Sequence, residues 1–277
     1  MRYNVANETS FYSMPLRPSF PGIATVLAAA LASAAPAHAQ PVPAAGCIAP
    51  PDLVRLDHPL RRTAQRYSGG MPITIVAVGS SSTEGAGASS PAMSYPSQLA
   101  VELKKLWPRA DIKVVNRGIG GETATEMLAR FDRDVIGEKP DIVVWQVGSN
   151  SVLRNQPIAG AGHLIRDGLK RLKDTGADVI LMNPQYAPKV FTKPDAERMV
   201  DLIDRSANEA KVDLFQRYAV MRYWRLTENI PFEMFLSPDE LHMNDWSYGC
   251  IARLLAGAIA EAATRPTLTA GARSIRQ

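Results

Sequence analysis

Residues 73–78 read ITIVAV, and Gly79, Ser80, Ser81 and Ser82 follow them directly. An almost unbroken apolar run of this length is typical of a strand that is buried on both faces, as in a parallel sheet. In an open parallel sheet, ligands bind in the crevice beyond the carboxyl ends of the strands. The run therefore predicts a central strand of a parallel sheet, and the small polar residues after it predict a loop at a binding site.

Similar apolar runs recur along the chain and alternate with longer segments of helical spacing. The further strand candidates are residues 112–115 (IKVV), 142–147 (IVVWQV), 179–182 (VILM) and 212–215 (VDLF). The helix candidates are residues 96–107, 123–135, 158–174, 194–210 and 245–262. Strands that alternate with helices form a parallel sheet covered on both faces. The sequence therefore predicts the α/β class, with a five-stranded parallel sheet between two layers of helices.

The composition limits the classes of protein to which the chain can belong. Of 277 residues, 46% are apolar and 21% are charged, with only 2 cysteines, which excludes a disordered chain and a small disulfide-rich scaffold. The 31 Lys and Arg residues and the 27 Asp and Glu residues leave a net charge of only +4, and no run of five like charges occurs. Because nucleic-acid-binding proteins carry basic patches or stripes, we expect no nucleic-acid partner.

The first 39 residues have the features of a secretory signal peptide. Residues 22–35 (GIATVLAAALASAA) are apolar, a basic residue precedes them, and the small residues Ala37 and Ala39 follow. An apolar core of about 14 residues is too short to span a bilayer. We expect a true initiator at Met14, cleavage after Ala39, and export to the periplasm or the medium. A buried core helix is the alternative, but the prolines that follow the segment do not fit it.

The mature chain should then consist of a leader (residues 40–70), a main domain (residues 71–264) and a tail (residues 265–277). No second long apolar run follows, so we expect no integral membrane segment in the mature chain. Cysteines of exported proteins are usually oxidised, and Cys47 and Cys250 are therefore predicted to form a disulfide. Lipid attachment at Cys47 is a weaker alternative, because the apolar core ends too far upstream.

Only His242 is well placed to act as the base that a serine nucleophile needs. His38 is lost with the signal peptide, His58 precedes the first strand, and His163 falls within a predicted helix. Asp239 lies three residues before His242, where a carboxylate can hold the imidazole toward a serine. An ordinary helix-entry loop and half of a metal site are the alternatives. Further metal ligands are missing nearby in the sequence, so we expect no metal.

Four short motifs, in order along the chain, resemble the blocks of the SGNH or GDSL hydrolase superfamily. Residues 79–82 (GSSS) resemble the first block and identify Ser81 as the nucleophile. Residues 116–123 (NRGIGGET) contain the glycine of the second block, Gly121, and residues 148–151 (GSNS) contain the asparagine of the third, Asn150. Asp239 and His242 match the D-x-x-H of block five. The likeness extends over about residues 71–262.

The resemblance implies both a fold and a site. The fold is a three-layer α/β/α sandwich of the flavodoxin-like type, with a parallel sheet in the order 2-1-3-4-5 and without a metal or organic cofactor. The site is a triad of Ser81, His242 and Asp239. Its oxyanion hole consists of the backbone N–H groups of Ser81 and Gly121 and the side-chain amide of Asn150.

The chain departs from the superfamily at two positions. Serines stand where two aspartates are usual, at Ser80 and at Ser151. Neither position is that of the triad aspartate. The departures therefore affect the assignment to a subfamily and leave the expected chemistry unchanged.

The resemblance implies an exported serine esterase that hydrolyses carboxylic esters through an acyl-enzyme. Because the loops are short and no apolar lid separates the motifs, the expected substrate carries a short acyl group, such as an O-acetyl group on a carbohydrate. Gln146, Tyr186 and Met243 are candidates for lining its pocket, with a purely structural role as an equal alternative. An O-acyltransferase with the same triad and a non-catalytic glycan-binding protein stay open. The sequence does not indicate an oligomeric state.

Overall fold

Five parallel strands form one sheet in the order β2-β1-β3-β4-β5. The computed structural model describes residues 46–266, so the predicted signal peptide and nearly all of the predicted tail lie outside the described residues. The α/β class and the sheet order agree with the prediction. The strands are β1 (Ile73–Gly79), β2 (Ile112–Gly118), β3 (Ile142–Gln146), β4 (Asp178–Met182) and β5 (Asp213–Phe215).

The helices differ widely in length, and the long ones cover the sheet. The described helices are α1 (Pro51–Val54), α2 (Arg61–Ser68), α3 (Ser81–Glu84), α4 (Tyr95–Leu106), α5 (Ala124–Ala129), α6 (Phe131–Asp134), α7 (Ser149–Leu153), α8 (Ile158–Asp174), α9 (Pro188–Phe191), α10 (Ala196–Ala210), α11 (Arg217–Leu226), α12 (Phe232–Phe235) and α13 (Asp245–Thr264), with short 3-10 turns η1 (Pro91–Met93) and η2 (Ile136–Glu138). Helix α8 has the predicted bounds, and α4, α10 and α13 differ from prediction by one or two residues at their ends.

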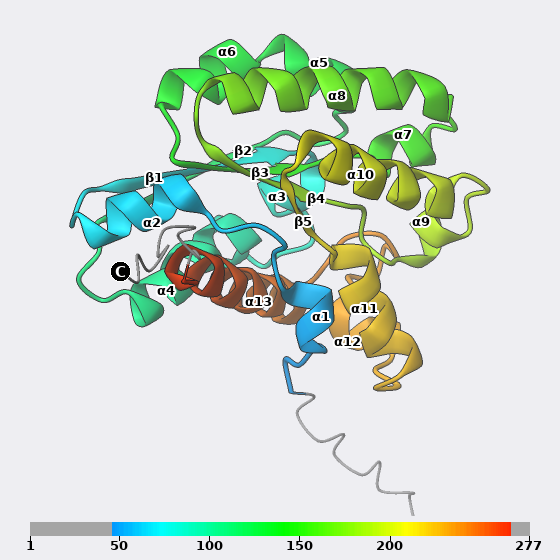
Figure 1. The fold of residues 1–277 in the computed structure, drawn as a ribbon. Coiled ribbons are helices and arrows are strands. Elements are labelled where there is room, and N and C mark those ends of the chain that lie inside the picture. The colour runs from blue at the N-terminus through cyan, green and yellow to red at the C-terminus, as the bar shows by residue number, and fades with distance from the viewer. Residues whose placement is uncertain (1–45, 267–277) are drawn as a thin grey trace, which may run out of the picture. The chain divides into compact units, whose positions relative to one another are not determined.

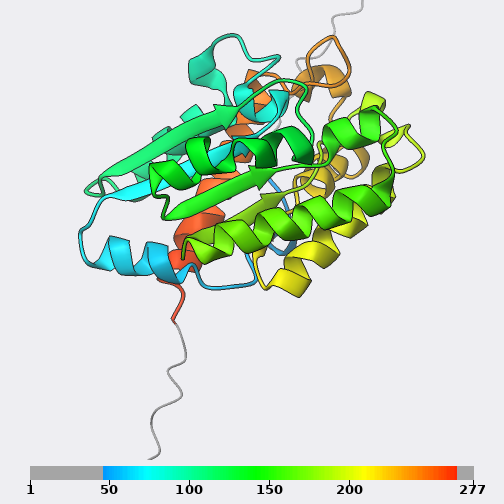
Figure 2. The ribbon, with the colours of Figure 1, turned by 90° about the horizontal axis from the view of Figure 1, so that it is seen from above.

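Helices lie on both faces of the sheet, as the predicted layers require (Figure 1). One layer contains α5, α8 and α10, and the other contains α4 and α13, which pack against each other. Figure 2 shows α8 in front of the strands, all of which run in the same direction. The carboxyl ends of the strands therefore meet at one edge of the sheet, where the candidate site lies.

Strand β1 lies between β2 and β3 in the interior of the sheet and fixes the position of the loop that follows it. Residues 75–78 are 0% exposed, and Val76 pairs with Val115 of β2 on one side and with Val143 of β3 on the other. Both edges and both faces of β1 are covered, and burying this apolar surface contributes about 25 cal/mol per Å². The point at which β1 ends is thus held rigidly.

The helix predicted over residues 123–135 is wrong in one respect, because it is divided into α5 and α6 at Arg130. The Arg130 side chain is only 7% exposed and donates to the carbonyl oxygens of Gly79, at 3.3 Å, and of Arg117, at 2.9 Å. It also pairs with Glu122 at 2.6 Å. The break depends on carbonyl groups at the ends of two strands. The local periodicity of the sequence does not predict contacts with such distant groups.

The segment from residue 46 to residue 70, most of the predicted leader, packs against the main domain. It contains α1 and α2, and Leu56 and Leu60 are completely or almost completely buried in the core. Cys47 forms a disulfide with Cys250 of α13, with 5.3 Å between their Cα atoms. Within residues 46–266, no helix has the length and apolar character needed to cross a bilayer.

Candidate active site

Ser81 is the first residue of α3 and lies directly beyond the carboxyl end of β1. The turn into α3 runs so close to β2 that a Cβ added at Gly118 would lie 2.0 Å from the backbone nitrogen of Glu84. Only glycine fits this close approach of two backbones. The packing of α3 on β2 therefore fixes the orientation in which Ser81 leaves the sheet.

His242 and Asp239 lie in the segment between α12 and α13, next to Ser81. Nε2 of His242 is 2.9 Å from Oγ of Ser81, and Nδ1 of His242 is 2.5 Å from Oδ2 of Asp239. The imidazole is 18% exposed, which leaves it accessible to a reactant. The three side chains form one hydrogen-bonded series in which a proton can move from the serine to the imidazole.

The second carboxylate oxygen of Asp239 accepts three further hydrogen bonds. Its donors are the Ser237 hydroxyl at 2.8 Å and the backbone N–H groups of Leu241 at 3.0 Å and His242 at 2.9 Å. Burial alone would raise the pKa of Asp239, but these hydrogen bonds and the contact with the imidazole hold it below its usual range. Asp239 is thus ionised and rigidly oriented. No motif of the sequence singled out Ser237, although it stands two residues before Asp239.

The three groups that were predicted as oxyanion donors, on Ser81, Gly121 and Asn150, follow the carboxyl ends of β1, β2 and β3. Among the described residues, none accepts a hydrogen bond from the backbone N–H of Ser81 or of Gly121. The Asn150 amide donates one hydrogen bond to the carbonyl oxygen of Glu122, at 2.8 Å. An amide nitrogen carries two hydrogens, so one of them stays available.

The loop that contains Gly121 is held from two sides. Gly121 has a φ of +80°, a conformation that favours glycine, and its carbonyl oxygen accepts a hydrogen bond of 2.6 Å from Arg154. Its neighbour Glu122 pairs with the buried Arg130. These contacts hold the loop on the carbonyl side of Gly121 in place.

The three candidates for lining the pocket have different environments. Gln146 and Met243 are 0% exposed, so neither side chain can contact a substrate in this structure, and the expectation for them is wrong. Gln146 instead binds Ser80, and Met243 packs in the core and pairs with Leu236. Tyr186 is half-buried and stacks on Phe191, with 4.6 Å between ring centroids, so it stays a candidate.

The two other histidines of the described region form hydrogen bonds with residues other than Ser81. The backbone N–H of His58 donates to Asp213 at 2.8 Å, and His163 on α8 is within 3.0 Å of Arg166. No group of three His, Cys, Asp or Glu side chains suited to a metal ion occurs in residues 46–266.

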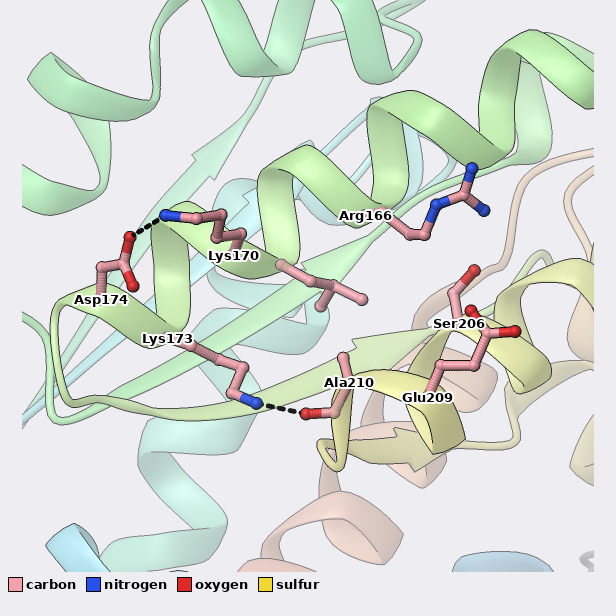
Figure 3. A pocket seen from close by; sticks show the side chains of 8 residues that line it. Arg166, Lys170, Lys173, Asp174, Ser206, Glu209 and Ala210 are labelled. Carbon is pink, nitrogen blue, oxygen red and sulfur yellow. Dashed lines mark hydrogen bonds and ion pairs between the residues drawn. The ribbon is translucent and has the colours of Figure 1, made fainter.

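Of two cavities, one borders the segment that carries Asp239 and His242, and the other lies elsewhere. A cavity of about 470 Å³ borders the segment that carries Asp239 and His242; its lining includes Pro188, Phe232, Glu233, Ser237, Glu240 and Asn244. A cavity of about 360 Å³ lies between α8 and α10 (Figure 3). There Lys170 pairs with Asp174 at 2.9 Å, and Lys173 donates to the carbonyl oxygen of Ala210. These residues precede the starts of β4 and β5, so this second cavity lies toward the opposite edge of the sheet.

The parallel sheet and the loops after its strands define a protein of the SGNH or GDSL-like hydrolase superfamily. Residues 46–265 match the model of the non-GDSL lipase-like family, and the chain belongs to this family. An acetylxylan esterase of Geobacillus stearothermophilus is 32% identical over 127 residues, which are 40% of this chain and 58% of that protein. An arylesterase of Vibrio mimicus is 26% identical over 122 residues, which are 40% of this chain and 60% of that protein.

The match thus spans less than two thirds of the length of either relative. A solved structure of a two-domain esterase active on acetylated mannans has a TM-score of 0.65 and 20% identity, covering 79% of this chain and 58% of that one. This structural likeness shows the fold. The family is thus described as lipase-like, and both relatives are named esterases.

Proposed function

We propose that the protein is a serine esterase that hydrolyses carboxylic esters through an acyl-enzyme. The observation that carries the proposal is the series from Ser81 Oγ through His242 to Asp239, with contacts of 2.9 and 2.5 Å. The lipase-like family and the esterase relatives support the same class of reaction.

Ser81 acts as the nucleophile and His242 as the proton carrier in both halves of this reaction. Ser81 Oγ attacks the ester carbonyl carbon while Nε2 of His242 takes the hydroxyl proton. The carbonyl electron pair moves to the oxygen and gives a tetrahedral intermediate. When this electron pair re-forms the carbonyl, the bond to the alcohol oxygen breaks, and the alcohol leaves with the proton from Nε2. Water then attacks the acyl-enzyme by the same route and releases the carboxylic acid. Asp239 stays ionised and stabilises the imidazolium.

The oxyanion of each tetrahedral intermediate is bound by the three donors described above. The unpaired N–H groups of Ser81 and Gly121 and the second amide hydrogen of Asn150 support this role. Because the donors are fixed before the reaction, they stabilise the transition state without reorganisation.

We further propose that the substrate carries a short acyl group, such as acetyl, on a carbohydrate. One relative is named an acetylxylan esterase, and one structural neighbour is an esterase active on acetylated mannans. The cavity beside the catalytic segment combines Phe232 and Pro188 with Glu233, Glu240 and Asn244. Such a mixture of apolar and polar groups suits a polar alcohol more than a long acyl chain.

Hydrolysis of p-nitrophenyl esters from acetate to palmitate, and of an acetylated xylo-oligosaccharide, tests the proposal. Activity should be highest from acetyl to butyryl and fall beyond about eight carbons; a preference for palmitate would overturn the proposed acyl length. Ser81→Ala should abolish activity, whereas Ser90→Ala, in an exposed loop, should retain it. Acetylated sugar formed in place of acetate, with a sugar acceptor present, would identify an acyltransferase instead.

A serine-directed organophosphorus reagent tests the identity of the nucleophile. Ser80 and Ser82 flank Ser81, but they are at most 2% exposed and contact Gln146 and Arg217. We expect the adduct on Ser81 alone, dependent on His242. Peptide mapping that finds it on either neighbour would contradict the proposed nucleophile.

A further inference from the structure

A chain of buried polar side chains begins at Ser80, the residue before Ser81. The backbone N–H and the hydroxyl of Ser80 both donate to Oε1 of Gln146, at 2.8 and 3.0 Å. Nε2 of Gln146 lies 3.5 Å from Oγ of Ser149, which donates to Oε1 of Gln185 at 2.9 Å. All four side chains are 3% exposed or less. The residue before the proposed nucleophile is therefore held from inside the protein.

Arg217 closes this chain on the other side of Ser81. Its Nη2 donates to the same Oε1 of Gln185 at 3.1 Å, and its Nη1 donates to the hydroxyl of Ser82 at 2.9 Å. Nε of Arg217 donates to the carbonyl oxygen of Asn183 at 3.1 Å. These hydrogen-bonded side chains form a circuit that runs from Ser80 to Ser82 and is closed by the backbone through Ser81. The circuit thus anchors both neighbours of Ser81.

The same circuit anchors the segment that carries His242. Nε2 of Gln185 donates to the carbonyl oxygen of Leu241, the residue before His242, at 3.2 Å. Since Arg217 binds the other end of the Gln185 amide, it determines how that amide is turned. Arg217 therefore helps to position both partners of the hydrogen bond between Ser81 and His242.

Arg217 carries its positive charge into the core, and none of residues 46–266 forms an ion pair with it. Its side chain is 0% exposed, and the oxygens that it binds belong to a hydroxyl, an amide and a backbone carbonyl. Burial lowers the pKa of Arg217 to about 10, so it stays protonated at neutral pH. The ionisable groups that act on it are Tyr95 and Tyr248, both neutral phenols, because burial raises the pKa of Tyr95 to about 12 and that of Tyr248 further.

Burying an apolar side chain of similar volume would cost less free energy of desolvation than burying an unneutralised charge. A purely structural role therefore does not account for an arginine here. Serine stands at position 80, where the superfamily usually has an aspartate, so no member of this circuit is a carboxylate.

We propose that Arg217 is a positioning residue of the active site, which fixes the Ser81 and His242 segments relative to each other and whose uncompensated charge stabilises the oxyanion formed at Ser81. This inference rests on the proposed function. Electrostatic stabilisation is strong where the charge is buried and fixed in advance. The role predicts an effect on kcat, because the oxyanion exists only in the reaction and not in the bound ester.

The first test compares Arg217→Gln, which removes the charge, with Arg217→Lys, which keeps it. With p-nitrophenyl acetate, Arg217→Gln should lower kcat about 10- to 100-fold with KM changed less than about twofold, and Arg217→Lys should recover a large part of the loss. Arg171→Gln, on the outer helix α8, is the matched control and should retain kcat. Wild-type kcat in a folded Arg217→Gln variant, or a lysine variant no better than the glutamine one, would overturn the inference.

A second pair of variants keeps Arg217 and covers the case in which its replacement prevents folding. Gln185→Glu gives the guanidinium an anionic partner, and Gln185→Leu removes the same contact to Leu241 without adding charge. We expect a kcat at least about fivefold lower in Gln185→Glu than in Gln185→Leu. The thermal midpoint of Gln185→Glu should be no lower than that of Gln185→Leu. Equal kcat values in the two variants would refute the role of the charge.

The outcome for Ser81→Ala separates this inference from the proposed function. If Ser81→Ala is inactive while both Arg217 and Gln185 pairs show no charge effect, only the inference about Arg217 fails. If Ser81→Ala is fully active, the proposed function fails, whatever the Arg217 variants do.

Discussion

His242 Nε2 lies 2.9 Å from Ser81 Oγ, although the two residues are 161 positions apart in the chain. Ser81 is positioned by the end of the interior strand β1, whereas His242 is held in a short loop closed by the bridge between Leu236 and Met243. The Asn244 side chain then caps α13 by accepting a hydrogen bond from the Ser247 N–H at 3.2 Å. The contact thus joins two elements that are each rigid in their own surroundings.

Replacing Asn150 by alanine should mainly affect the transition state. The variant loses one oxyanion donor, so we expect kcat to fall about 10²- to 10³-fold, with KM little changed. Asn208→Ala, on the exposed face of α10, is the matched control and should behave as wild type. Steady-state kinetics with p-nitrophenyl acetate measures both constants. Wild-type kcat in Asn150→Ala would leave the Ser81 and Gly121 N–H groups as the only donors.

The pH dependence should report one ionisation in the acid range. Hydrogen bonds hold the pKa of Asp239 below its usual range, so the carboxylate keeps its charge down to at least about pH 4 and adds no ionisation above it. A lowered carboxyl pKa also means that its stabilising effect is complete above about pH 4 and is lost only as the pH falls further. We expect log(kcat/KM) to fall with a slope of one below neutrality; a slope of two would contradict this.

Asp239→Asn should show that this carboxylate orients and stabilises the charged imidazole. We expect kcat at neutral pH to fall about 10³- to 10⁴-fold, because an amide cannot stabilise the imidazolium. Asp174→Asn, at the end of α8, removes an exposed carboxylate and serves as the control. A variant of Asp239 with more than about one tenth of wild-type kcat would remove Asp239 from the triad.

The disulfide between Cys47 and Cys250 should contribute to stability without affecting catalysis. It closes a loop with a sequence separation of 203, worth ideally about 5 kcal/mol in the free energy of unfolding. The double variant Cys47→Ala/Cys250→Ala should therefore unfold at lower temperature but retain its kcat at 25 °C. A reductant should lower the thermal midpoint of the wild type and leave that of the double variant unchanged. Two free thiols in denatured, unreduced protein would contradict the pairing.

Export should remove the first 39 residues. Intact-mass analysis of the exported protein should find Gln40 at its amino terminus, because Ala37 and Ala39 provide a small-x-small cleavage site. A gene that begins at Met14 should give the same product, whereas replacing Ala39 by a large charged residue should block processing. A mature protein that still contains residues 22–35 would overturn the proposed export.

The sequence predicted those parts of the fold that depend on local pattern. The buried run at residues 73–78 and the helical spacing at residues 158–174 gave β1 and α8 at nearly their observed bounds. The helices α1, α11 and α12 are among those that were not predicted, and contacts with distant segments contribute to their stability. An example is the hydrogen bond from Trp224 to the carbonyl oxygen of Ile48, at 2.9 Å.

The sequence by itself determined the order of the strands, through the family resemblance, and the residue types at Ser81, Asp239 and His242 on which the proposed ester chemistry depends. Only the tertiary structure decided which of the other polar residues are buried. It placed Gln146 beneath the site rather than in its pocket, and it brought Arg217 to Ser82 from 135 positions away. Burial and charge pairing depend on segments that are adjacent only after folding, so a linear pattern of residues cannot specify them.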